Sequence, residues 1–254
     1  MLRPVKDLQG YAIHATDGDI GQVDEFYFDD ERWTIRYLVV ATGNWLSGRK
    51  VLISPIAIGK ADWVAEKLNL ALTKGQVENS PDIDTHKPVS RQREIEYFNY
   101  YGYPYYWYGG GLWGADAYPS ALTAAGALGA ESAMERETVP PEAQGDPHLR
   151  STSEVIGYYI EAADGELGHV EDLIVDDESW AIRYIVVDTA NWWLGKKVLV
   201  APQWIERVSW AESKVYVNLP REAIKNSPEY DPLALINREY EERLYGHYGR
   251  PRYW

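Results

Sequence analysis

One stretch of twelve residues decides the fold of this chain, and it occurs twice. It reads Asp29-Asp30-Glu31-Arg32-Trp33-Thr34-Ile35-Arg36-Tyr37-Leu38-Val39-Val40, and it returns 147 residues later as Asp176-Asp177-Glu178-Ser179-Trp180-Ala181-Ile182-Arg183-Tyr184-Ile185-Val186-Val187. In each copy an acidic turn leads into a segment with the two-residue period of a β-strand. We therefore expect Trp33, Ile35, Tyr37 and Val39 to share one face of a strand.

The repeat extends far beyond this stretch. A single offset aligns residues 10–107 with residues 157–254 without a gap, and roughly 40 of about 100 aligned positions are identical. Turns are kept as well as apolar positions, for example Asp17-Gly18 and Asp164-Gly165. Because the loops have kept their lengths, we interpret the chain as a tandem duplication.

Each copy contains the signals of a small all-β unit followed by helices. In the first copy, apolar or alternating runs separated by turn residues predict strands at 11–15, 21–28, 33–40, 50–54, 58–60 and 67–72. Five or six short strands of this kind are typical of a barrel. We expect a single helical turn capped by Thr73, then a helix at 90–101 that ends at Gly102. The counterpart of that helix lies at 237–248 and ends at Gly249.

The order of these motifs resembles the PRC-barrel family. The resemblance rests on Asp17-Gly18, Ile20-Gly21, Asp29-Asp30, residues 35–40 and residues 50–55, each repeated in the second copy. It covers about residues 5–80 and 152–227. The resemblance implies a mainly β fold of two small PRC-type β-barrels in tandem, each followed by a short helical and aromatic tail. It also implies an interaction and assembly module without shared catalytic residues, although a fold alone does not determine function.

We expect three parts along the chain. Residues 1–107 form the first repeat, with its barrel at about 5–80 and its tail at 81–107. Residues 108–150 are rich in Gly, Ala, Pro and Glu and form a flexible connector. Residues 151–254 form the second repeat, with its barrel at about 152–227 and its tail at 228–254.

Composition excludes several classes of site and partner. The 254 residues contain no cysteine, which removes disulfides, thiolate metal sites and cysteine nucleophiles. The net charge of −14 would repel a phosphate backbone, so we expect no nucleic-acid partner. The longest small and apolar run, residues 121–130, is about half as long as a membrane-spanning helix, so we expect no membrane insertion. With no secretory signal at the N-terminus, we expect a cytoplasmic protein.

We identify no catalytic, cofactor-binding or metal-binding constellation. The acidic turns at 29–31 and 176–178 could bind a hard cation, but they lack the spacing of a calcium loop, and we interpret them as solvated turns. The five histidines are not paired at metal-ligand spacing, and none recurs in the repeat. Residues 109–111 are three glycines without the Lys-Ser/Thr of a phosphate loop, which favours a hinge. We expect Arg36 and Arg183 to form salt bridges with turn carboxylates, or to contact a ligand or partner.

Aromatic residues in loops and tails are the candidate interaction residues. The chain has 20 Tyr and 11 Trp against 3 Phe, and Tyr and Trp are common at interfaces. The repetition of aromatic positions in both tails predicts that each tail docks on a barrel, its own or its partner's. The candidates are Trp45, Trp192, Trp193, Tyr103, Tyr105, Tyr106, Trp107, Tyr253 and Trp254.

These observations favour a non-enzymatic protein-interaction scaffold or adaptor, with a protein partner or self-association and no cofactor. One alternative is a self-assembling structural protein, a homo-oligomer or a filament subunit. A weaker alternative is a binder of a small ligand in a groove between the barrels.

Overall fold

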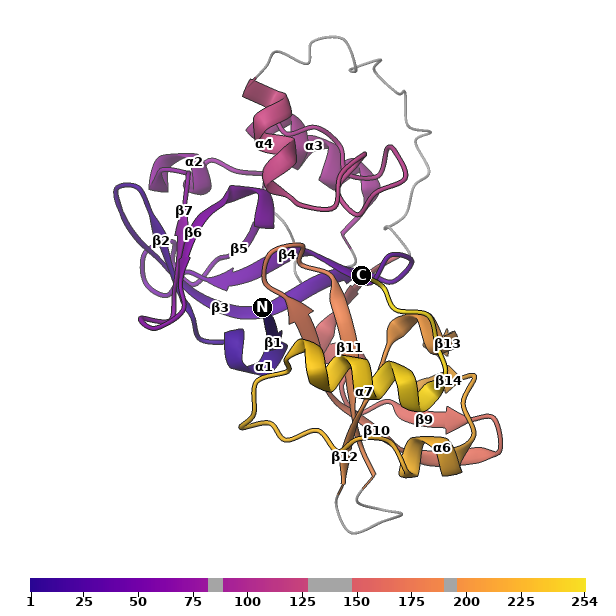
Figure 1. Cartoon of the computed structure of the whole chain (residues 1–254). Helices are drawn as coiled ribbons and strands as arrows, with labels where there is room; N and C mark the ends of the chain where they lie inside the picture. The colour runs from indigo at the N-terminus through magenta and orange to yellow at the C-terminus, as the bar shows by residue number, and fades with distance from the viewer. Residues whose placement is uncertain (82–88, 128–147, 190–195) are drawn as a thin grey trace. The chain divides into compact units, whose positions relative to one another are not determined.

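The computed structural model describes residues 1–81, 89–127, 148–189 and 196–254, which form two compact units (Figure 1). The β3 unit consists of Asp7–Ser151 and Glu178–Ala181. The β10 unit consists of Met1–Lys6, Thr152–Asp177 and Ile182–Trp254. A seven-stranded sheet forms the centre of each unit, so the predicted mainly β class is confirmed.

In the β3 unit six strands pair in the order β5-β4-β3-β2-β7-β6, and β8 pairs with β3 outside this path. Among the described residues the path does not close from β5 back to β6, so the expected barrel is an open sheet in its hydrogen bonding. The 3-10 helix η1, led by Pro55, carries the chain from β5 to β6. The strands and the turn are β2 (Ala12–Ala15), β3 (Gly18–Asp29), β4 (Thr34–Ala41), β5 (Lys50–Ile53), η1 (Pro55–Ala57), β6 (Ile58–Asp62), β7 (Lys67–Leu70) and β8 (Leu149–Ser151).

The β10 unit repeats this topology in the order β12-β11-β10-β9-β14-β13, and β1 pairs with β10 outside the path. Its parts are β1 (Leu2–Pro4), β9 (Tyr159–Ala162), β10 (Gly165–Asp176), β11 (Ile182–Asp188), β12 (Lys197–Val200), η2 (Pro202–Trp204), β13 (Ile205–Ser209) and β14 (Lys214–Val217). The gap-free sequence repeat is thus a repeat of strand order.

A long strand organises each sheet. Strand β3 pairs with β2 along its first part and with β4 along its second, and a bulge between Val23 and Glu25 interrupts the register. At Gly21 a Cβ atom would lie 2.1 Å from the carbonyl oxygen of Ala41, and at Gly168 it would lie 2.1 Å from that of Asp188. Only glycine permits this close approach of two backbones, which explains why it recurs in both copies.

The stretch that decides the fold begins its strand one residue later than expected. Trp33 and Trp180 have φ angles of 48° and 59°, in the left-handed region, and β4 starts at Thr34. The prediction that Trp33 shares a strand face with Ile35 and Tyr37 is therefore wrong. Because the acidic turn closes through a positive φ, Trp33 leaves the strand and packs on Phe28, with ring centroids 5.3 Å apart.

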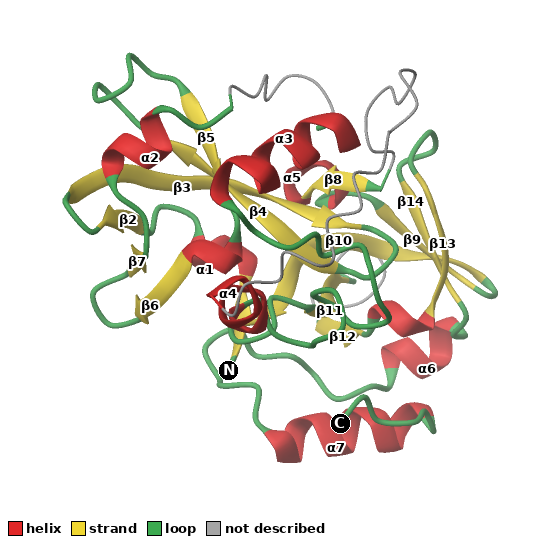
Figure 2. Ribbon diagram, turned by 90° about the horizontal axis from the view of Figure 1, so that it is seen from above, coloured by secondary structure: helices red, strands yellow, loops and turns green. Residues whose placement is uncertain are grey.

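The predicted helix ends are confirmed. Ser90 and Asn237 cap the N-termini of α3 and α7, and Gly102 and Gly249 end them in the left-handed conformation. Figure 2 shows the helices beside the sheets. They are α1 (Val5–Leu8), α2 (Lys74–Glu78), α3 (Arg91–Tyr101), α4 (Ser120–Ala127), α5 (Thr152–Val155), α6 (Arg221–Lys225) and α7 (Arg238–Tyr248). Among the described residues, none of these helices is long and apolar enough to cross a membrane.

The two repeats exchange their first strands. Strand β1 precedes the first repeat in sequence but pairs with β10, and β8 precedes the second repeat but pairs with β3. The compact units therefore differ from the predicted division into residues 1–107 and 151–254. Strand pairing is decided by backbone hydrogen bonds between distant segments, which a repeat in the sequence does not reveal.

The expectation of a flexible connector at residues 108–150 is wrong for its described part. Residues 108–127 fold within the β3 unit, where Trp113 is completely buried and Leu122 of α4 is nearly so. Leu149–Ser151 forms β8. Apolar side chains within a segment rich in glycine and alanine supply enough burial to fix it. Residues 128–147 lie outside the described residues.

The close backbone approach at Gly168 gives a first prediction. Gly168→Ala should destabilise the β10 unit by roughly 3 kcal/mol, because the new Cβ would overlap the carbonyl oxygen of Asp188. Gly246→Ala is the control: it lies in α7 with no atom within 4 Å of the added Cβ, and should stabilise by about 1 kcal/mol. Urea unfolding followed by circular dichroism measures both, and similar shifts for the two variants would contradict this account.

Candidate interaction site

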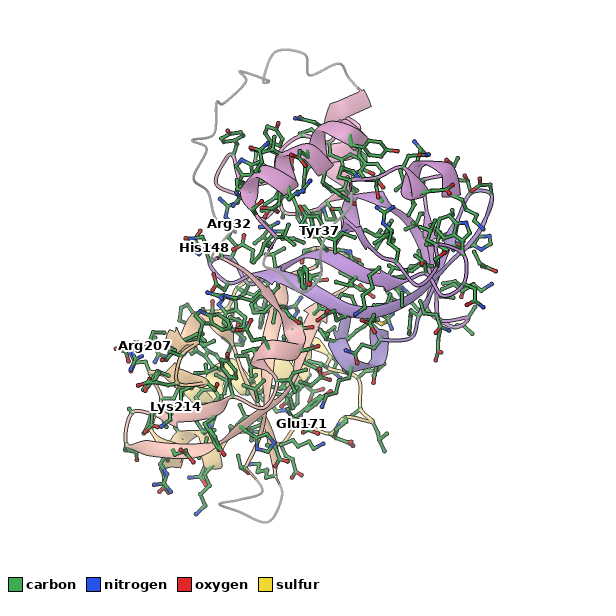
Figure 3. The ribbon with its side chains drawn as sticks, turned by 180° about the vertical axis from the view of Figure 1, so that it is seen from behind. Arg32, Tyr37, His148, Glu171, Arg207 and Lys214 are labelled. Atoms are coloured by element: carbon green, nitrogen blue, oxygen red, sulfur yellow. The ribbon has the colours of Figure 1, made fainter. Side chains whose placement is uncertain are left out.

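A buried glutamate joins the sheet, the helix and the tail of the β3 unit. Glu94 of α3 is completely buried, and its Oε1 accepts hydrogen bonds from the hydroxyls of Tyr37 on β4 and Tyr106 in the tail, both at 2.8 Å. Arg91 pairs with the other carboxylate oxygen at 2.9 Å. Figure 3 shows Tyr37 where β4 faces the helices. A buried carboxylate is stable only when charge and hydrogen bonds compensate it, so the three elements depend on one another.

The β10 unit contains the same arrangement. The Oε1 atom of Glu241 accepts hydrogen bonds from Tyr184 on β11 and Tyr253 in the tail, both at 2.7 Å. Arg238 pairs with its other oxygen at 3.1 Å. Because every partner recurs at the same offset, the duplication has preserved a complete polar network.

The strand arginines bind the turn carboxylates, as one of the two alternatives predicted. Arg36 Nη2 lies 2.9 Å from Asp29 Oδ2, and Arg183 Nη2 lies 3.2 Å from Asp176 Oδ2. The Arg36 guanidinium also stacks over the Tyr106 ring at 3.9 Å. The arginine therefore ties the start of the hairpin to the aromatic tail.

The expectation that the acidic turns are solvated is wrong. Asp29 is buried, and Asp30 and Asp177 bind basic groups of the exchanged strands. A turn that must neutralise a neighbouring arginine is drawn into the fold rather than left in water. Within the described part of the chain, no group of three or more His, Asp or Glu side chains could hold a metal ion.

Burial raises the pKa of the tyrosines in these networks. Desolvation is the largest cause for Tyr37, Tyr106 and Tyr184, and the nearby carboxylates of Glu94 and Glu241 raise the pKa further. A neutral phenol can donate to the carboxylate, whereas a phenolate would repel it. The networks thus hold the tyrosines protonated, a state that suits a structural hydrogen bond.

The first aromatic tail packs on its own helix. The ring of Phe98, completely buried in α3, contacts all four candidate residues of the tail at centroid distances of 5.4 to 6.2 Å. Those four residues are Tyr103, Tyr105, Tyr106 and Trp107. Tyr106 is buried, while the other three are half-buried and leave part of each ring accessible to a partner.

The remaining candidates fall into three situations. In the second tail Tyr253 is half-buried, and Trp254 is 42% exposed with Arg238 stacked over its ring at 4.1 Å. Trp45 is half-buried and packs against the ammonium of Lys74 at 4.6 Å, at the edge of its own unit. Trp192 and Trp193 lie outside the described residues. Whether any of these side chains binds another protein stays a prediction.

The three glycines form a packed loop rather than the expected hinge. Arg32 donates hydrogen bonds to the carbonyl oxygens of Gly109 and Gly111, at 3.1 and 2.6 Å. A Cβ at Gly111 would lie 2.3 Å from the carbonyl oxygen of Asp116, so the loop needs glycine for a close turn. The loop ends at Trp113, whose Nε1 donates to the carbonyl oxygen of Ser179 at 2.7 Å.

Two strongly exposed leucines lie in a segment that the sequence analysis did not select. Leu233 is 97% exposed and Leu235 is 74% exposed, in the connection between α6 and α7. The segment is fixed at both ends: the Tyr230 amide donates to the carbonyl oxygen of Lys197 at 2.8 Å, and Asn237 caps α7. We call residues 232–235 the leucine loop.

The role of Glu94 and Glu241 was not among the predictions made from the sequence. The signal was available, because an acidic residue inside a helix recurs with the tyrosines and the arginines at identical spacing. The leucine loop has no such signal. Its counterpart in the first repeat differs in sequence and lies within residues 82–88, outside the described residues.

The buried network gives a second prediction. Glu94→Ala should destabilise the β3 unit by about 3 kcal/mol, because Arg91 and two buried hydroxyls lose their partner. Glu96→Ala on the same helix is the matched control, since its pair with Arg93 is exposed and should be worth less than about 1 kcal/mol. Thermal unfolding compares the two, and equal losses would show that Glu94 does not organise the unit.

A third prediction concerns alkaline pH. The folded pKa values of Tyr37 and Tyr106 lie above the unfolded value of about 10, and burial raises that of Tyr103 to about 12. The folded state therefore binds more protons, so stability is complete below about pH 10 and falls as the pH rises above it. Tyr37→Phe removes one of these tyrosines, so the difference in bound protons between the folded and unfolded states at alkaline pH should fall by about one. Stability should then decrease less steeply with pH. Urea midpoints measured between pH 8 and pH 11 test it, and a flat profile would disprove it.

Comparison with known proteins places this architecture in a family. The family model of the PRC-barrel domain matches residues 3–68 and 148–224, more than half of the chain. A search of curated proteins finds no match. In chain order the first match runs from within β1 to within β7, and the second covers β8 to β14. The chain therefore belongs to the PRC-barrel family and carries the domain twice.

Proposed function

We propose that this chain is a non-enzymatic protein-interaction scaffold or adaptor, and that the leucine loop is its principal contact with a partner protein. The observation that carries the proposal is the exposure of Leu233 and Leu235 in a segment anchored at both ends. Exposed leucine side chains do not contribute hydrophobic free energy to folding. Burying each one against a partner would contribute about 2 kcal/mol to the free energy of binding.

The conformation of the loop favours recognition. The Leu233 amide donates to Asp231 Oδ1 at 2.9 Å, and the Ala234 amide donates to the carbonyl oxygen of Asp231 at 3.0 Å. These bonds form a turn that fixes the backbone before a partner arrives. A preformed loop loses less conformational entropy on binding than a flexible one, so its apolar side chains contribute more to affinity.

The buried polar groups support a non-enzymatic role. Glu94 and Glu241, the carboxylates with the most chemically suggestive surroundings, are enclosed and bonded to tyrosines and arginines of their own units. The hydroxyls of Tyr37 and Tyr106 occupy Glu94 Oε1. We therefore assign these residues to holding the tails in place rather than to catalysis.

The partner would present an apolar pocket or groove. The two leucines are separated by one residue, so a shallow apolar site could hold both, with basic groups facing Asp231 at its rim. The charge of −14 on the chain would speed the approach of a partner with basic groups around such a site.

Affinity capture from the cells that make this protein tests the proposal. Wild-type chain and a Val64→Ser variant should retain the same partner, because Val64 is 97% exposed but lies in the turn between β6 and β7 of the other unit. The double variant Leu233→Ser, Leu235→Ser should bind the purified partner at least about tenfold more weakly. Capture of the same protein by all three chains with equal affinity would refute the assignment of the leucine loop.

A further inference from the structure

The two exchanged strands have the same short sequence pattern. Strand β1 begins Leu2-Arg3 and strand β8 begins Leu149-Arg150, at the same offset of 147 residues that relates the repeats. We call these segments the donor strands. Their acceptors are the edges of β10 and β3, which are also counterparts in the duplication.

The donor strands bind in the same register. Leu2 lies opposite Asp176 and Arg3 opposite Val175, while Leu149 lies opposite Asp29 and Arg150 opposite Phe28. The carbonyl oxygen of the residue before each leucine accepts a hydrogen bond from an acidic-turn amide, that of Asp177 at 2.9 Å or of Asp30 at 2.8 Å. Two independent segments therefore satisfy one pattern of backbone bonds.

Ion pairs also join each donor strand to its acceptor edge. Arg3 Nε lies 2.6 Å from Asp177 Oδ2, and Arg150 Nε lies 3.4 Å from Asp30 Oδ2. His148 adds a second basic group 3.2 Å from Asp30, at the end of the hairpin where Figure 3 labels it beside Arg32. Each acceptor edge thus recognises an extended segment with an arginine placed to reach the second aspartate of the turn.

Each donor strand belongs to the same family domain as the repeat that follows it in sequence. The family matches begin at residues 3 and 148, so each match includes a donor strand together with the repeat that follows it. In the structure each of these strands completes the other sheet. This is the relation found in domain swapping, in which an element leaves its own domain to fill the equivalent place in a copy.

We propose that the acceptor edges are strand-exchange sites and that their second occupant is the donor strand of another copy of this chain. In the exchanged dimer, β1 of each copy pairs with β10 of the other. The ladder and the bond between Arg3 and Asp177 are the same whichever copy supplies β1. Only the effective concentration of the tethered strand favours the closed chain, and a three-residue strand contributes little beyond that to resist replacement. This inference is independent of the leucine loop.

Disulfide trapping between two single-cysteine copies tests the proposal, because the chain has no cysteine of its own. Leu2→Cys is made in one preparation and Asp176→Cys in another carrying a different tag, so that Arg3 and Asp177 keep their bond. Opposed residues of an antiparallel pair lie within the range that a disulfide spans. After mixing under mild oxidation, the mixed disulfide should form at least about tenfold faster than between Leu2→Cys and Val64→Cys, whose cysteine lies in an exposed turn.

Two further measurements make the result decisive. Leu2→Cys and Asp176→Cys in one chain should form an intramolecular disulfide, which checks the register without requiring a second copy. Circular dichroism of each single variant should match the wild type. A mixed disulfide no faster than the Val64→Cys control would overturn the exchange between copies, and failure of the double variant to close would overturn the register on which it rests.

Discussion

The buried carboxylate of Glu94, like that of Glu241, joins three segments of its unit that are distant in sequence. A strand tyrosine and a tail tyrosine donate to one oxygen, and a helix arginine approaches the other. An isolated carboxylate in this position would cost several kcal/mol, so the sheet, the helix and the tail are stable only together. This dependence explains why the polar residues of the network are identical in both repeats while many core residues around them have changed.

With the tail held in this way, its aromatic rings serve first as part of the fold. Phe98 packs on the rings that follow it, and Arg36 stacks on Tyr106. The surfaces that we propose for partners lie elsewhere: on the leucine loop and, for a second copy of the chain, on the sheet edges that receive the donor strands.

Much of the architecture could be predicted from the sequence because each local pattern occurs in both copies of the repeat. Alternating residues predicted the strands, capping residues and Gly102 predicted the limits of α3, and mid-strand Arg36 predicted a salt bridge to a turn. The predictions were wrong at positions where the same local sequence pattern is compatible with two conformations. Trp33 fits a strand pattern but adopts a positive φ, and the acidic turn resembles a solvated loop until an arginine is brought beside it.

The sequence by itself therefore determined the mainly β class, the duplicated PRC-barrel domain and the ends of α3 and α7, because periodicity, turn residues and caps act within a few residues of one another. Only the tertiary structure decided that β1 and β8 change places, that Glu94 binds two tyrosines and that Leu233 remains exposed. These features depend on which distant groups meet, and both donor strands carry the same Leu-Arg pattern. A pattern shared by both repeats cannot specify to which sheet each strand is added.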